Sequence, residues 1–230
     1  IYIRKDHLKS AKKIESFASR EGGFLLNNVI FVVLCFAVFW GTIFPVVSEA
    51  VRGTKITVGA PFFNQINTPI GLILLGLTGV GPLLAWRKTS NEKIKNNFFL
   101  PTLIGGILFI ILMACGYDVY VVISFSLCLF VIIAIYMEFY KGAKSRIVRF
   151  NESFFVALYK IISKNRSRYG GYIVHVGIVL MFVGFTGNAF DMEKEFGLKK
   201  GSSEFVGDYE FLLTDITEEE RPNHYAWISH

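Results

Sequence analysis

Residues 98–137 decide the fold of this chain, and they read FFLPTLIGGILFIILMACG-YD-VYVVISFSLCLFVIIAIYM. Neither apolar half contains Lys, Arg, Asp or Glu, and only Tyr117 and Asp118 separate the two halves. An apolar segment of about 20 residues is long enough to cross the hydrocarbon core of a membrane as a helix. Backbone amides find no water in hydrocarbon, so each half is predicted to be helical rather than extended. Together the halves predict a tight antiparallel helical hairpin within a membrane.

Three more blocks of the same kind lie on either side of this hairpin. Hydrophobic residues make up 53% of the chain and the mean hydropathy is +0.47, which is too apolar for an ordinary soluble domain. The predicted spans are Asn27–Val47, Pro69–Trp86, Phe98–Gly116, Val119–Met137 and Tyr172–Phe190. The sequence therefore predicts an all-α polytopic membrane protein with five transmembrane helices, followed by a small and incomplete extracytoplasmic β tail domain.

The basic residues predict how these spans are oriented. Residues 1–26, the loop Arg87–Asn97 and the loop Glu138–Gly171 hold six, four and eight of the 24 Lys and Arg residues. With five spans these segments share one side of the membrane, and an excess of Lys and Arg marks the cytoplasmic side. Residues 48–68 and the tail 191–230 are then predicted to lie on the opposite, outer side of the membrane.

The division of positive charge among short loops also bears on partners. Loops beside membrane spans favour anionic lipid headgroups, so membrane lipid is an expected partner. Nucleic acid is not, because its binding surfaces gather positive charge in one place. The chain begins at Ile1 and stops at His230 within an alternating apolar run, so we interpret it as a piece of a longer protein.

The tail differs in character from the rest of the chain. Residues 191–220 hold ten acidic residues. The alternation of Tyr209, Phe211 and Leu213 predicts a half-buried strand, and Pro222-Asn223 predicts a turn before a second strand near Tyr225. We expect residues 202–230 to form part of a small β-domain.

Two shorter signals concern the first and second spans. Gly59 and Pro61 predict a turn in the outer loop, where Phe62 and Phe63 are interpreted as anchors at the membrane surface or, alternatively, as a partner-docking site. The sequence Gly79-Val-Gly-Pro82 predicts a kink within the second span.

His175 is the only histidine within a predicted span. Ionisable residues at that depth are costly and usually functional, and neutral imidazole is a good ligand for iron, including haem iron. The alternative is a histidine that hydrogen-bonds a neighbouring helix. Gly170, Gly177 and Gly184 recur every seven residues and predict a close helix contact on one face, with His175 pointing nearly the opposite way toward a pocket.

Several ordered motifs carry a family resemblance. They are Leu25-Leu-Asn-Asn28, Gly41-Thr-Ile-Phe-Pro45, Lys55-Ile-Thr-Val-Gly-Ala-Pro-Phe-Phe-Asn64, Gly79-Val-Gly-Pro-Leu-Leu-Ala-Trp-Arg87 and Arg168-Tyr-Gly-Gly-Tyr-Ile-Val-His-Val-Gly177. In order and content they resemble the C-terminal half of CcmF and the related NrfE proteins, the haem-lyase component of bacterial cytochrome c maturation. The resemblance runs from about Ser19 to the end of the chain.

The resemblance implies cytochrome c maturation. It implies that the protein takes haem from a CcmE-like haem chaperone and helps attach it covalently to apocytochrome c, with a CcmH-like thiol-handling chaperone, at the outer face of the membrane. It also implies a haem b held by two histidines, one of which matches His175, with Tyr172 as a supporting residue at i−3. The second histidine and the tryptophan-rich WWD segment of the family are not in this sequence, so this piece alone is not expected to be an active synthase.

Two other classes of protein stay open. A polytopic permease or haem exporter would place polar or ionisable groups along several helices, whereas only one predicted span holds an ionisable residue. A structural membrane scaffold would use His175 for packing alone. The haem absorbance of the full-length protein distinguishes these possibilities.

The predicted orientation can be tested with reporter fusions. A fusion within the loop Arg87–Asn97 is expected to behave as cytoplasmic, because this loop and the two other basic segments hold 18 of the 24 basic residues. A fusion placed in residues 48–68 is the matched control and is expected to behave as periplasmic. Periplasmic behaviour of the first fusion would overturn the orientation.

Overall fold

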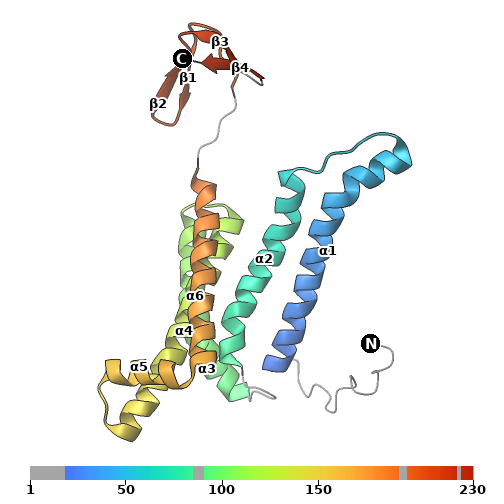
Figure 1. The fold of residues 1–230 in the computed structure, drawn as a ribbon. Coiled ribbons are helices and arrows are strands. Elements are labelled where there is room, and N and C mark those ends of the chain that lie inside the picture. The colour runs from blue at the N-terminus through green and yellow to red at the C-terminus, as the bar shows by residue number, and fades with distance from the viewer. Residues whose placement is uncertain (1–18, 85–90, 192–195, 222–223, 230) are drawn as a thin grey trace. The chain divides into compact units, whose positions relative to one another are not determined.

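The structure is a computed structural model that describes residues 19–84, 91–191, 196–221 and 224–229 (Figure 1). The chain divides into two compact units between Thr186 and Gly187. The first unit is helical and the second holds the strands.

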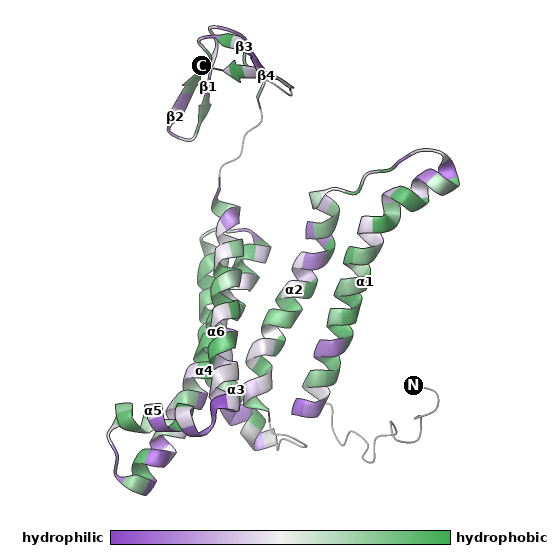
Figure 2. Ribbon diagram, viewed as in Figure 1, coloured by the Kyte–Doolittle hydropathy of each residue, from purple (hydrophilic) through white to green (hydrophobic). Residues whose placement is uncertain are grey.

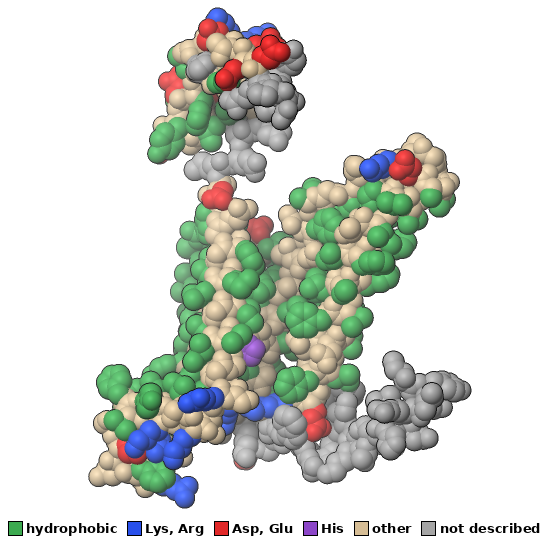
Figure 3. All heavy atoms as spheres, in the orientation of Figure 1, with side chains coloured by type: hydrophobic (Ala, Val, Ile, Leu, Met, Phe, Trp, Pro, Cys, Tyr) green, Lys and Arg blue, Asp and Glu red, His purple; other side chains and the backbone are tan. Residues whose placement is uncertain are grey.

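Helices build the first unit, and five of those in the described residues are long and apolar enough to cross a membrane. This confirms the predicted fold class. The helices are α1 (Arg20–Arg52), α2 (Ala60–Leu83), α3 (Asn91–Ala114), α4 (Val119–Phe150), α5 (Phe154–Lys164) and α6 (Arg166–Gly187). Figure 2 shows hydrophobic residues along the middle of the long helices and hydrophilic residues toward their ends. The hydrophobic side chains also cover the outward helix surfaces in Figure 3, where a membrane protein meets lipid rather than water.

Capping residues explain where the first two helices begin and end. The hydroxyl of Ser19 accepts a hydrogen bond from the Gly22 amide at 3.1 Å, and α1 ends at Gly53, whose φ of 68° is left-handed. Gly59 is the N-cap of α2 and Pro61 lies in its first turn. Proline is well suited to a first turn because its missing N–H is not needed there, so Gly59 and Pro61 begin a helix.

Close contacts at two glycines hold α2 between α1 and α4. A Cβ atom on Gly41 of α1 would lie 2.8 Å from the rings of both Phe62 and Phe63. These rings therefore pack against α1. A Cβ atom on Gly79 of α2 would lie 2.6 Å from the Phe130 ring of α4. The helix α2 ends at Leu83, directly after Pro82, and the kink predicted at residues 79–82 stays a prediction.

The carbonyl groups at the end of α2 are bound by side chains of two other helices. Arg20 Nε of α1 donates to the Leu84 carbonyl at 2.7 Å, and Arg20 Nη2 donates to the Pro82 carbonyl at 3.1 Å. Asn97 Nδ2 of α3 donates to the Leu83 carbonyl at 3.3 Å, and Lys141 Nζ of α4 donates to Asn97 Oδ1 at 2.7 Å. The start of α1, the end of α2 and the start of α3 thus meet at one end of the bundle, which we call the basic end.

The short helix α5 was not predicted, and it packs across α4 at the basic end (Figure 1). Ala157 and Ile161 are buried against α4, whereas Phe155 and Tyr159 on the other side are exposed. Because the helix carries apolar residues on two sides, its sequence does not resemble either a membrane span or an ordinary polar loop. Its 11 residues are also too few to cross a membrane.

An ion cluster closes the corner between α4 and α5. The carboxylate of Glu152 accepts hydrogen bonds from Arg146 Nε at 2.7 Å and from Lys160 Nζ at 2.6 Å. These two hydrogen bonds lower the pKa of Glu152 to about 2, and the bond from Arg146 has the larger effect. Glu152 therefore stays ionised, and the corner stays tied, throughout the ordinary pH range.

The second unit contains two separate antiparallel ladders. β1 (Ser203–Val206) pairs with β2 (Tyr209–Leu212), and β3 (Ile216–Arg221) pairs with β4 (His224–Ser229). Gly207 has a φ of 59°, the positive value that a two-residue hairpin turn requires at its first residue.

The predicted strand at Tyr209 is present, but it is not half-buried. Tyr209 and Phe211 are exposed, and only Leu213, which follows the strand, is buried. A two-stranded ladder has no second layer to cover its apolar face, which explains the exposure. The predicted turn at Pro222-Asn223 lies outside the described residues.

The contact at Gly79 can be tested by adding one methyl group. Gly79→Ala is expected to lower the free energy of unfolding by about 1–3 kcal/mol, because the Phe130 ring must move to admit the new Cβ. Thermal unfolding of the detergent-solubilised protein measures this. Gly106→Ala is the matched control, since no described atom lies within 4 Å of a Cβ there. Equal stability of the two variants would show that α2 and α4 do not approach as described.

Candidate functional site

The face of α6 that carries His175 packs against α2 and α4. Cys128 Sγ of α4 lies 3.9 Å from the Val179 carbonyl, and the hydroxyls of Ser124 and Thr186 lie 2.5 Å apart. Phe182 lies 3.6 Å from the position of a Cβ atom on Gly71 of α2. These contacts place His175 on the protein-facing side of α6, as the sequence predicts.

The glycine stripe of α6 has no comparable contact. A Cβ atom on Gly170, Gly177 or Gly184 would meet no atom within 4 Å among the described residues. The predicted close helix contact on this face is therefore wrong for the part of the chain that the structure describes. The reason is that α6 packs through the larger side chains of its opposite face.

A cavity of about 220 Å³ lies between α1, α2 and α6. Its polar lining side chains are Arg20, Asn27, Thr78, Tyr172 and His175, and its other lining residues are apolar or glycine. Small-molecule sites measure about 300–1,000 Å³, so a larger ligand must extend past the walls that the described residues supply. The cavity brings together the two residues that the sequence singled out, His175 and Tyr172.

The imidazole of His175 has an unusual feature for a purely structural residue. Its Nδ1 atom is buried and has no hydrogen-bond partner among the described residues. A buried polar atom without a partner costs about 1–3 kcal/mol, so it calls for an explanation by a ligand or a further protein group. The alternative of a histidine hydrogen-bonded to a neighbouring helix finds no partner for Nδ1 among the described residues.

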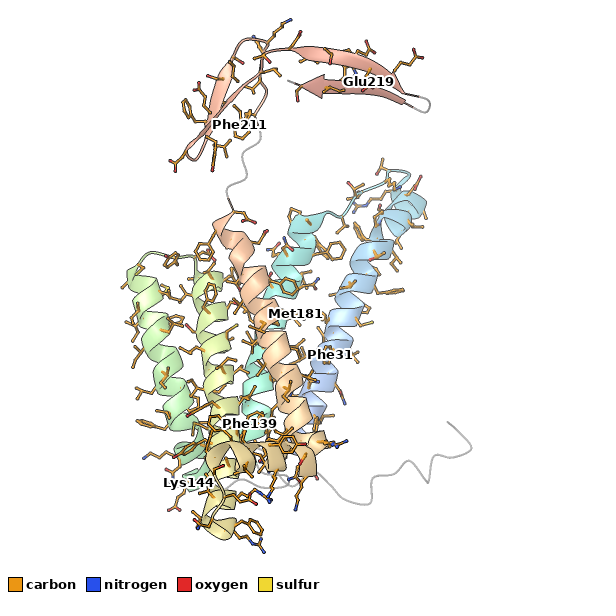
Figure 4. All side chains as sticks on the ribbon, turned by 60° about the vertical axis from the view of Figure 1, so that its left-hand side comes forward. Phe31, Phe139, Lys144, Met181, Phe211 and Glu219 are labelled. Atoms are coloured by element: carbon orange, nitrogen blue, oxygen red, sulfur yellow. The ribbon has the colours of Figure 1, made fainter. Side chains whose placement is uncertain are left out.

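Tyr172 forms one wall of the cavity and is held by a buried acid. Its hydroxyl donates to Glu138 Oε2 at 3.4 Å and accepts from Arg168 Nε at 3.0 Å. Arg168 Nη2 in turn donates to Glu138 Oε2 at 2.5 Å. The Phe139 ring, labelled in Figure 4 on α4, lies 6.0 Å from the Tyr172 ring. Tyr172 is therefore fixed beside the cavity, and its hydroxyl is used by Glu138 and Arg168 rather than by His175.

Sequence reasoning missed Glu138, which is only 8% exposed and lies within the continuous helix α4. The predicted span ended at Met137, so Glu138 was assigned to a loop. One signal could have found it: Glu138 is the single acidic residue of the segment 119–150, which otherwise carries only basic charges.

The donor set of the site suits one kind of metal group. The described residues contain no cluster of three or more His, Cys, Asp or Glu side chains that could hold a bare metal ion. In haem the porphyrin supplies four nitrogen ligands, so a single imidazole from each side is enough. A buried imidazole nitrogen without a partner, an apolar lining and one cation all fit such a group.

The fold and the site define a polytopic membrane protein with a half-buried histidine that lines a cavity between helices. Comparison with known proteins gives the family. The chain is 31% identical to the cytochrome c-type biogenesis protein CcmF of Haemophilus influenzae over 90% of its length and to CycK of Rhizobium meliloti over 99%. It is 27% identical to CcmF of Escherichia coli over 97% of its length. No protein-family model and no solved structure matches the chain.

The chain belongs to the CcmF/NrfE family of cytochrome c-type biogenesis proteins. It spans about a third of the length of the curated relatives it matches, 31% to 33% for these three. The resemblance carried by the sequence motifs is thereby confirmed.

The link between Glu138 and Tyr172 can be tested by removing the carboxylate. Glu138→Ala is expected to lower the free energy of unfolding by about 1–2 kcal/mol, because it leaves the buried Tyr172 hydroxyl without its acceptor. The half-exposed Arg168 adds little, since water replaces its partner. Glu92→Ala, at an exposed acid in α3, is the control and is expected to change stability by less than about 0.5 kcal/mol. Equal melting temperatures of the two variants would contradict the network.

Proposed function

We propose that this chain is part of a haem lyase that matures cytochromes c at the outer face of the bacterial inner membrane. The whole protein receives haem from a CcmE-like chaperone. It attaches this haem to apocytochrome c, which a CcmH-like thiol-handling protein presents. The family of the chain supports this proposal, and the basic end supports the orientation, with residues 1–26 in the cytoplasm and the tail 191–230 in the periplasm.

The observation that carries the proposal is the buried Nδ1 atom of His175 beside the cavity. We propose that the His175 imidazole is one axial ligand of a haem b, and that a histidine elsewhere in the whole protein supplies the other. When bound, a haem b supplies one-electron redox chemistry to the site.

The other residues of the chain have simpler roles in this proposal. Tyr172 is a supporting residue that keeps the cavity wall in place, since its hydroxyl is tied to Glu138 and Arg168. Apolar residues of α1 and α2 line the cavity, and an apolar surrounding limits solvent access and so tunes the redox potential of a bound metal group. Neither role requires Tyr172 to contact iron.

A haem transporter or permease is supported less well. A transport path needs polar groups along several helices at successive depths. The charged side chains Arg20, Glu138 and Arg168 bind one another or backbone carbonyls near the basic end. Polar side chains elsewhere in the described spans, such as Ser124 and Thr186, are uncharged and bind each other. A scaffold role leaves the unpartnered nitrogen of His175 without an explanation.

The proposal is tested by His175→Ala in the full-length protein. Haem occupancy is expected to fall, or the reduced absorbance spectrum to change, because one axial bond is lost. Insertion into the membrane is expected to be intact, since Ala is cheaper to bury than His. Val174→Ala, one residue away on an exposed part of α6, is the matched control and is expected to keep the wild-type spectrum. Wild-type haem content and spectrum in His175→Ala would refute the ligand assignment.

A further inference from the structure

Among the described residues that line the cavity, Arg20 is the only one with a permanent charge. It is the first residue of α1, and none of the described lining residues is Asp or Glu. A cation at the wall of a mostly apolar cavity favours a ligand with negative charge, because the low dielectric strengthens the attraction.

The guanidinium of Arg20 is held in place by two of its N–H groups, and its other N–H groups are not needed for this support. It has five N–H groups, of which Nε–H binds the Leu84 carbonyl and one N–H of Nη2 binds the Pro82 carbonyl. Both acceptors belong to the end of α2 and also line the cavity, so the guanidinium is anchored at the cavity wall. The three remaining N–H groups have no acceptor among the described residues, and a carboxylate matches the planar geometry of a guanidinium.

We propose that Arg20 binds a carboxylate of the ligand that His175 holds. This inference rests on the proposed function, in which that ligand is a haem, and assigns the haem propionates to Arg20. His175 and Arg20 then bind different parts of one molecule, the imidazole its iron and the guanidinium its acidic edge. The two contacts fix the orientation of the macrocycle in the cavity, which a single axial bond leaves free to rotate.

A purely structural role for Arg20 makes a different prediction. Asn97 also binds a carbonyl at the end of α2, that of Leu83, but it does not line the cavity. If Arg20 only supports α2, loss of Arg20 and loss of Asn97 have the same effect on ligand binding. If Arg20 binds a carboxylate, loss of Arg20 abolishes the preference for a carboxylate ligand over an uncharged analogue, whereas loss of Asn97 does not.

The experiment compares two ligands in the full-length apoprotein. Iron protoporphyrin IX and its dimethyl ester, whose propionates carry no charge, are titrated into wild-type protein, Arg20→Gln and Asn97→Ala, and binding is followed by the haem absorbance. In wild-type protein we expect the acid to bind about 10-fold more tightly than the ester, which is the effect of one charge-assisted hydrogen bond. Arg20→Gln is expected to remove this preference, and Asn97→Ala to retain it.

Two results overturn the inference. One is wild-type protein that binds the ester as tightly as the acid, a measurement that stands even if Arg20→Gln does not fold. The other is an Arg20→Gln variant that keeps the preference for the acid. Failure of the proposed function gives a separate result, since His175→Ala would then bind both ligands as wild-type protein does.

Discussion

Hydrogen bonds to the carbonyl groups at the end of α2 join the helices α1, α2 and α3 at the basic end. A helix leaves its last carbonyls without partners within the helix, and groups that are shielded from water need partners from other parts of the protein. Here Arg20 and Asn97 supply the hydrogen bonds from α1 and α3. The same bonds fix the start of α1 beside the end of α2, and so create the cavity that faces His175. The hydrogen bonds that support the end of α2 therefore also shape the cavity.

The membrane helices could be predicted from the sequence because hydropathy is a property of each segment alone. Lipid imposes the same requirement on every span, so blocks without charge mark the helices even in the absence of any tertiary information. His175 could be singled out for the same reason, since burial of an ionisable residue in such a block is costly. The family motifs then pointed to haem, which hydropathy could not do.

The features that sequence reasoning missed all depend on contacts between helices. Glu138 follows the apolar block directly, and only the course of α4 beyond it shows that the carboxylate is buried against Arg168. The helix α5 is apolar on two sides, because one side packs on α4 and the other is exposed. The glycine stripe of α6 shows the opposite error, since regular spacing predicted a contact that the described residues do not make.

The length of α4 has a consequence for the thickness of the bilayer. Its 32 residues rise about 48 Å at 1.5 Å per residue, whereas the hydrocarbon core measures about 30 Å. Glu138 is the twentieth residue of the helix, so it falls close to the boundary between hydrocarbon and headgroups. A thicker bilayer would draw the ion pair of Glu138 and Arg168 into hydrocarbon, while a thinner one would leave it in contact with water. This pair therefore favours a bilayer whose hydrocarbon core is about 30 Å thick.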